Sequence, residues 1–213
     1  MMHLIQQGGP MTLVIIGISF IAATIFFERA FHLHRAQIRA GDFLQGIFNI
    51  IGRGTGDVGG RLVEAISICD ETPGPVSQMV RAAILAHDQS PAHMRQAMET
   101  AGLAEIPRLE RHLGLLLSLA QAAPLCGLLG TVLGLIEVLG TIHAKAPLIH
   151  AGDLGGGMWQ ALISSAAGLI VAIPTYFGYN LLVSRVESVV LEMERVFPEV
   201  LTFFRNRENG QGK

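Results

Sequence analysis

Polar side chains that could carry chemistry lie inside or at the end of sequence stretches that are otherwise apolar. They are Gln121, Thr131, Glu137 and Thr141 in and just after residues 113–136, and Gln160, Ser164, Ser165 and Thr175 in residues 154–184. A polar group costs free energy at bilayer depth, so such residues are candidates for function. The chemistry open to hydroxyl, amide and carboxyl groups in this setting is the passage of protons or ions.

Spacing brings some of these groups onto one helix face. Gln160 and Ser164 are four residues apart, and Gly168 follows after four more, which predicts a narrow polar stripe along a helix. A serine or threonine hydroxyl can instead bond back to a carbonyl of its own helix. Both interpretations stay open for each hydroxyl.

Glu137 is the one acidic residue that these apolar spans include. An ionised carboxylate at bilayer depth is expensive unless it is paired or protonated, which makes Glu137 a candidate for proton transfer. His143 and Lys145 follow within two turns, so the side chain can also reach the outer membrane interface. Spacing does not choose between these roles.

Catalysis and cofactor binding are not supported by the motifs. Ser164 and Ser165 have no intramembrane His or Asp at a plausible spacing, and no H-E-x-x-H metal signature is present. The glycine-rich run GRGTGDVGG at residues 52–60 lacks the Lys and Ser/Thr of a phosphate-binding loop, which favours a turn. Cys69 and Cys126 form no disulfide framework and are expected to be free thiols. We expect a protein that is not an enzyme and holds no cofactor.

Composition places the chain in a membrane. Half of the 213 side chains are hydrophobic and 15% are charged, which is too apolar for a soluble domain of this length. Uncharged windows of at least ~20 residues, the length that a transmembrane helix needs, occur at 4–27, 113–136 and 154–184. The first could be a signal peptide, but it lacks a basic start and a clear cleavage site and continues into Glu28 and Arg29.

Basic residues indicate the orientation of these spans. Residues 28–112 hold nine Arg and the tail from Arg185 holds five Lys or Arg, whereas the loop between the second and third spans holds only Lys145. Cytoplasmic flanks retain positive charge, so the N-terminus is expected in the periplasm and the C-terminus in the cytoplasm of a multi-pass inner-membrane protein. The net charge of −2 gives no nucleic-acid footprint.

Helical periodicity continues beyond two of the spans. Apolar residues recur at helical spacing through 78–117, which predicts a helix that enters the membrane directly, and again through Leu182, Val186, Val189, Met193, Phe197, Val200 and Phe204. The second stripe needs partner helices, because the acidic polar face beside it is unlike that of a helix lying on a membrane.

Small residues distinguish the second and third spans from the first. They recur as Ala120, Ala123, Gly127, Gly130 and Gly134, and then as Ala161, Ser165, Gly168 and Ala172. Small residues let helix backbones approach closely in lipid. Three helices cannot enclose a pathway alone, so we expect a homo-oligomer centred on the second and third spans.

These patterns together predict an all-α membrane protein with three transmembrane helices, of which the second and third extend into the cytoplasm. The expected parts are a periplasmic N-terminus with the first span at 1–33, a cytoplasmic helical domain at 34–112, the second span at 113–142, a periplasmic loop at 143–153, the third span at 154–184 and a cytoplasmic helical tail at 185–213.

Two motifs carry a family resemblance. APLCGLLGTVLG at 123–134 and QALISSAAGLIVAIPTYFGYN at 160–180 resemble the two signature spans of the ExbB/TolQ family, whose distant relatives are the flagellar stator subunits. The resemblance runs from the first span, with its Glu28–Arg29 ending, to the tail, and it is closest to ExbB. It implies a pentameric ring of subunits around ExbD/TolR-like single-span partners, whose membrane aspartate carries the proton and whose motion is passed to a TonB/TolA-like protein.

The same resemblance assigns roles to residues. The family's GTV threonine falls on Thr131 and its third-span hydroxyl on Ser165, and with Gln160, Ser164 and Glu137 they are the expected proton-pathway or pore-lining residues. Well-known members carry a glutamate where this chain has Gln160, whose amide does not titrate near neutral pH. The partner's aspartate then carries the proton alone, Glu137 substitutes, or the coupled ion or activity differs.

The resulting hypothesis is a proton-channel and motor subunit that uses proton-motive force for outer-membrane import. A TolQ-like role in envelope integrity and division, and a non-conducting membrane scaffold, are the alternatives that the sequence leaves open.

Overall fold

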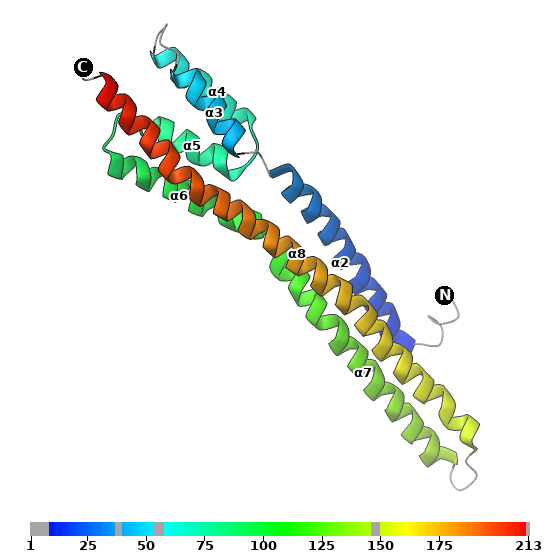
Figure 1. Cartoon of the computed structure of the whole chain (residues 1–213). Coiled ribbons are helices and arrows are strands. Elements are labelled where there is room, and N and C mark those ends of the chain that lie inside the picture. Colours follow the sequence, from blue (N-terminus) through cyan, green and yellow to red (C-terminus); the bar gives the residue numbers. More distant parts are fainter. Residues whose placement is uncertain (1–8, 37–39, 53–57, 146–149, 212–213) are drawn as a thin grey trace. The chain divides into compact units, whose positions relative to one another are not determined.

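The computed structural model describes residues 9–36, 40–52, 58–145 and 150–211 (Figure 1). All regular elements in these ranges are α-helices, which confirms the predicted all-α class. In chain order they are α2 (Gly9–Ala36), α3 (Ala40–Gly52), α4 (Val58–Glu71), α5 (Pro75–Leu85), α6 (Pro91–Glu110), α7 (Leu113–Lys145) and α8 (Ala151–Gln211).

Three helical stretches are long and apolar enough to cross a membrane. They lie within Gly9–Leu33, Pro91–Lys145 and Leu154–Asn206, which correspond to the three windows expected from the sequence. The chain is therefore a multi-pass membrane protein with three candidate spans.

The helices are distributed over two compact units. The first, which we call the membrane unit, comprises the described residues up to Arg29 together with those of His112–Leu182. It contains most of α2, all of α7 and the first half of α8. The second unit comprises Ala30–Arg111 and the described residues from Val183 onward, so it contains α3 to α6 and the second half of α8.

Large side chains fill the core of the second unit. Fully buried side chains come from five helices: Leu44, Ile47 and Ile51 of α3, Cys69 of α4, Met79, Val80 and Ile84 of α5, Met98 of α6, and Val196 and Val200 of α8. Phe48 of α3 stacks on Phe203 of α8 with ring centroids 4.2 Å apart. The apolar stripe predicted from Leu182 to Phe204 thus has the partner helices that it requires, although Val196, which was not predicted, is buried in place of Phe197.

Local sequence signals start two of these helices. Pro75 opens α5 after Gly74, whose φ of 142° is unfavourable for residues with a side chain, and the buried hydroxyl of Ser77 donates to the carbonyl oxygens of Thr72 and Gly74 at 2.7 Å. Ser90 caps α6 by accepting a hydrogen bond from the His93 N–H at 3.4 Å.

The helix predicted through 78–117 and into the second span is divided twice. α5 ends at Leu85 and α6 begins at Pro91, and a second break follows at the end of α6. α6 ends at Glu110 and α7 begins at Leu113, because His112 adopts a φ of +64° that a right-handed helix cannot contain. The Leu116 N–H still bonds the His112 carbonyl at 3.0 Å and closes the first turn of α7. Residue spacing alone did not reveal this two-residue break.

Cys69 and Cys126 are both free, as expected. Burial, helped by the neighbouring Asp70 carboxylate and opposed by Arg81, raises the pKa of Cys69 to about 11. Since the thiolate is the reactive form, Cys69 is a weak nucleophile near neutral pH and its role is packing.

Candidate functional site

The membrane unit is built on backbone contact between α7 and α8. A Cβ placed on Gly168 would lie 2.7 Å from the carbonyl oxygen of Ala123 and 3.1 Å from the Cα of Gly127, and a Cβ on Gly127 would lie 2.9 Å from the Ser164 carbonyl oxygen. A side chain at these glycines would thus meet backbone, which cannot rotate away. The predicted packing of the two spans through small residues is confirmed.

The same close approach continues toward the loop that joins the two helices. A Cβ on Gly134 would lie 2.7 Å from the Gly157 carbonyl oxygen, and one on Gly157 would lie 2.7 Å from Cγ2 of Val138. Gly157 belongs to the Gly155–Gly157 run, and its contribution to this contact was not foreseen. Gly157 lies seven residues before Ser164 and eleven before Gly168, which places the three residues on one face of a helix. This spacing would have identified Gly157 as part of the contact.

Ser164 is the third-span hydroxyl that packs most tightly. Only 1% of its surface is exposed within the subunit, and a Cβ on Gly130 would lie 2.5 Å from its Cβ and 2.8 Å from its Oγ. The neighbouring Ser165, which was placed in the small-residue stripe, is only half-buried, although its Cα also borders Gly127. Of the two serines, Ser164 is therefore the one that α7 covers.

Thr131 joins the two helices through its hydroxyl. Its Oγ1 lies 3.1 Å from the carbonyl oxygen of Gly127 on its own helix and 3.3 Å from the carbonyl oxygen of Ala161 on α8. Thr141 and Thr175, by contrast, donate to the carbonyl oxygens of Glu137 and Val171, four residues earlier in their own helices. Thr131 thus combines a local bond with a bond between spans.

Gln160 extends the site to α2. Its carboxamide packs against Gly9 at the start of α2, and the position that a Cβ on Gly9 would take is already occupied by Nε2 of Gln160. Gly9 has a φ of +68°, a conformation that favours glycine. The polar stripe of Gln160, Ser164 and Gly168 therefore lies on faces of α8 that α2 and α7 cover.

Glu137 is not part of this group. It lies near the end of α7 with its side chain exposed within the subunit, while its neighbour Val138 is buried against Gly157. The structure thus places Thr131, Ser164 and Ser165 at the contact between α7 and α8 and Gln160 at the contact between α8 and α2, and it leaves Glu137 outside both. The gathered groups are hydroxyls and one amide, which can donate and accept hydrogen bonds but cannot hold a transferable proton near neutral pH.

A charged cluster at the other end of α2 was not predicted from the residues. Nη2 of Arg29 lies 3.4 Å from Nδ1 of His112, and Oε1 of Glu28 lies 3.7 Å from the same nitrogen. Nδ1 of His112 thus faces a guanidinium donor and a carboxylate acceptor at once. Glu28 and Arg29 thus connect the end of the first span to His112, which directly precedes α7.

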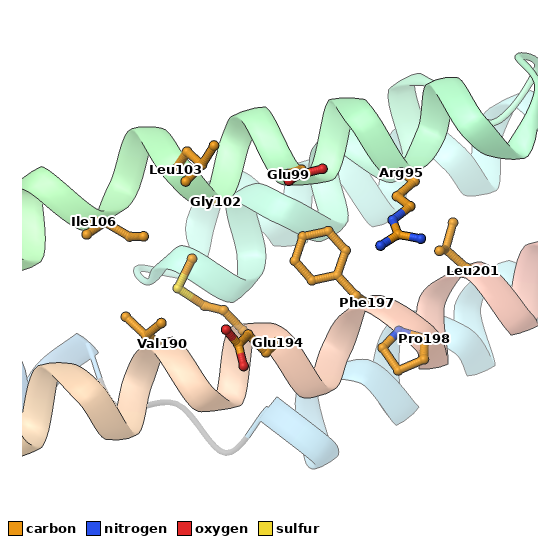
Figure 2. Close-up of a pocket in the computed structure, with 11 residues that line it drawn as sticks. Arg95, Glu99, Gly102, Leu103, Ile106, Val190, Glu194, Phe197, Pro198 and Leu201 are labelled. Carbon is orange, nitrogen blue, oxygen red and sulfur yellow. The ribbon is translucent and has the colours of Figure 1, made fainter.

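The second unit has a groove of its own between α6 and α8 (Figure 2). Its volume is about 460 Å³, and its walls combine apolar side chains such as Leu103, Ile106 and Phe197 with the charged Arg95, Glu99 and Glu194. Gly102 of α6 also lines the groove, and a Cβ there would lie 3.2 Å from Cε of Met193 on α8 and 3.3 Å from Sδ of Met79 on α5. Among the described residues, no three or more His, Cys, Asp or Glu side chains are grouped to hold a metal ion.

Known proteins resemble this chain over most of its length. An ExbB-like biopolymer transport protein of Synechocystis sp. is 27% identical over 82% of this chain and 81% of its own. The biopolymer transport protein exbB1 of Vibrio cholerae is 34% identical over 56% of this chain and 53% of its own. The Tol-Pal system protein TolQ of Haemophilus influenzae is 31% identical over 54% of this chain and 50% of its own.

A family model matches residues 71–195, which include all of α7 and the part of α8 that packs against it. The matched segment covers more than half of the chain, and the family consists of channels rather than enzymes. This chain belongs to the MotA/TolQ/ExbB proton channel family.

Proposed function

We propose that this chain is the ring-forming subunit of a proton-driven motor in the bacterial inner membrane. In this proposal five copies surround a single-span ExbD/TolR-like partner, and proton flow energises a TonB-like protein for import across the outer membrane. The observation that carries the proposal is the family match over 71–195, the segment that holds both signature spans.

The geometry of the membrane unit supports a stiff wall for such a channel. Glycine contacts and the bond from Thr131 to Ala161 join α7 and α8 into one pair, and Gln160 joins α8 to α2. A wall of this kind can move as a body against a partner helix. In this proposal the partly exposed Thr131, Ser165 and Gln160 supply hydrogen-bonding groups to water or to a partner carboxyl, whereas Ser164, only 1% exposed, holds α8 against α7.

The proton carrier in this proposal is the partner's carboxyl group. Gln160 replaces the titratable glutamate of well-known family members, and its amide is engaged at Gly9. Once protonated, the partner's aspartate is neutral and can pass an apolar wall, because the cost of a buried charge is removed. Glu137, exposed near the end of α7, is the subunit's own acidic group in this part of the chain and would act at the pore mouth.

The import role rests on the relatives. Several proteins similar to this chain are named biopolymer transport proteins, among them ExbB of Aquifex aeolicus at 37% identity over 43% of this chain. In the orientation that we propose, the N-terminus is periplasmic and the Arg-rich second unit is cytoplasmic.

Native mass spectrometry of the gently solubilised protein, with its co-purifying chains identified, tests the assembly. We expect five copies together with a smaller protein that has one span and an aspartate within it. A monomer would contradict the ring, and a ring without a partner would favour a passive scaffold. Thr131→Ala should then abolish outer-membrane uptake while leaving the native mass unchanged; loss of envelope integrity with intact uptake would instead indicate the TolQ-like role.

A further inference from the structure

An apolar groove runs between α2 and α8 on the membrane unit. Its volume is about 300 Å³, at the lower end of the ~300–1,000 Å³ that is typical of ligand pockets. Ala22, Ala23 and Phe26 of α2 form one side, Ile170 and Val171 of α8 form the other, and Leu116 of α7 closes it. Phe27 also lines the groove and is 70% exposed, so the groove opens sideways from the subunit.

The charged cluster of Glu28, Arg29 and His112 lies at one end of this groove. Arg29 follows Phe26 by three residues, one helical turn along the same face of α2. His112 directly precedes α7, and its carbonyl oxygen accepts from the N–H of the lining residue Leu116 at 3.0 Å. About 20 helical residues rise ~30 Å, the thickness of a bilayer's hydrocarbon core. A span that begins at Gly9 would therefore place Glu28 and Arg29 at the depth of lipid headgroups and the groove at the depth of acyl chains.

The accessible groups of the cluster differ in chemistry. The side chains of Glu28 and His112 are 46% and 35% exposed, whereas Arg29 is 5% exposed. Nη2 of Arg29 lies 3.4 Å from Nδ1 of His112. A carboxylate and an imidazole thus stand side by side, with a guanidinium charge close to the imidazole.

We propose that this site binds one phospholipid whose headgroup carries a phosphate and a primary ammonium. One acyl chain fills the groove, the phosphate lies beside the His112 ring near the Arg29 charge, and the ammonium donates to Glu28. A lipid without the ammonium would place a phosphate beside the Glu28 carboxylate with no compensating charge. A quaternary ammonium has no N–H to donate, so the charge-assisted hydrogen bond to Glu28 is specific to the primary amine.

The bound lipid would connect three segments of the chain. It would contact α2 and α8 through its acyl chain and the start of α7 through His112 and Leu116. This role is independent of proton transport and of the partner protein.

Quenching of a single tryptophan by brominated phospholipids tests the site in the full-length protein reconstituted in bilayers. Phe27→Trp places the reporter in the groove, and Trp159→Phe removes the chain's only native tryptophan. Phe20→Trp in the same background is the matched control, because Phe20 is 76% exposed on α2 but is not among the residues that line the groove. The probes are phosphatidylethanolamine, phosphatidylcholine and phosphatidylglycerol with identical brominated chains.

We expect the tryptophan at position 27 to prefer phosphatidylethanolamine over both other lipids by roughly two- to fivefold, the range that an exposed ion pair supplies. Adding Glu28→Gln should remove that preference, and the tryptophan at position 20 should show none. Equal quenching by the three lipids at position 27, preference for phosphatidylglycerol, or a preference that survives Glu28→Gln would overturn the assignment. Position 27 shielded from all lipids while position 20 is quenched would show that protein covers the groove, which would also overturn it.

Discussion

The helices inside the membrane unit and those inside the second unit pack in opposite ways. In the membrane unit, α7 and α8 meet through glycines whose missing side chains let the backbones touch, as at Gly127 and Gly168. In the second unit, large side chains such as Met79, Met98 and Val200 fill the space between helices. Burial from water drives association only where water is the solvent, whereas in lipid close packing must supply the attraction. The membrane unit should therefore be most sensitive to added atoms and the second unit to removed ones.

The largest effect is expected from truncation in the second unit. Met98 is completely buried, and Met98→Ala should lower the free energy of unfolding by about 2–5 kcal/mol, because it removes apolar contacts and leaves a cavity. Chemical denaturation followed by far-ultraviolet circular dichroism measures this change. Val63→Ala on the exposed face of α4 is the control and should stay within about 0.5 kcal/mol of the parent.

Addition of one methyl group at the span contact should have the next largest effect. Gly168→Ala places a Cβ 2.7 Å from a backbone oxygen of α7, and overpacking of this kind costs about 1–3 kcal/mol. Thermal unfolding followed by the fluorescence of Trp159, on α8 itself, reports it. Gly140→Ala in α7, with nothing within 4 Å of its Cβ position, is the matched control; equal losses in both variants would refute packing as the cause.

The same substitution in the second unit sharpens the comparison. A Cβ at Gly102 would meet the flexible ends of Met193 and Met79 at 3.2 and 3.3 Å, and these side chains can move. Alanine also favours a helix over glycine by up to about 1 kcal/mol. Gly102→Ala should therefore change stability by less than about 1 kcal/mol. A loss as large as that of Gly168→Ala would show that neighbour flexibility does not distinguish the units.

The smallest effect is expected at Thr131. Thr131→Val keeps the shape and removes the bond to the Ala161 carbonyl, and hydrogen bonds between membrane helices average about 0.6 kcal/mol. Thr141→Val removes only a bond within α7 and is the control. Thermal unfolding of the two single variants, measured side by side, should resolve the difference. A Thr131 variant that unfolds at no lower temperature than the Thr141 variant would remove the case for a bond between spans.

Much of this architecture could be predicted because its signals are local in sequence. Uncharged length identifies the spans, and the spacing of small residues identifies the faces at which α7 and α8 meet. The division of α6 from α7 at His112 escaped prediction, because one residue with positive φ leaves no mark on hydrophobic periodicity. Contacts of Gln160 with Gly9 and of Arg29 with His112 join residues far apart in sequence, and only the folded arrangement of α2 reveals them.

The sequence identified the residues of the candidate site but not the groups that they contact. Thr131, Gln160 and Ser164 were selected because polar groups are rare in spans, but their partners depend on helix rotation. Spacing could not tell that Ser164 rather than Ser165 would be the buried hydroxyl. The pore-lining role of these residues stays a prediction.

The central claim is that this subunit forms the wall of a proton channel whose titrating group belongs to its partner. Proton flux into liposomes driven by a membrane potential tests it directly, with the purified subunit reconstituted alone and with its single-span partner. We predict flux above that of empty liposomes only for the complex, and its loss when the partner's membrane aspartate is replaced by asparagine. Equal flux from the subunit alone, or flux that survives the aspartate substitution, would contradict the account.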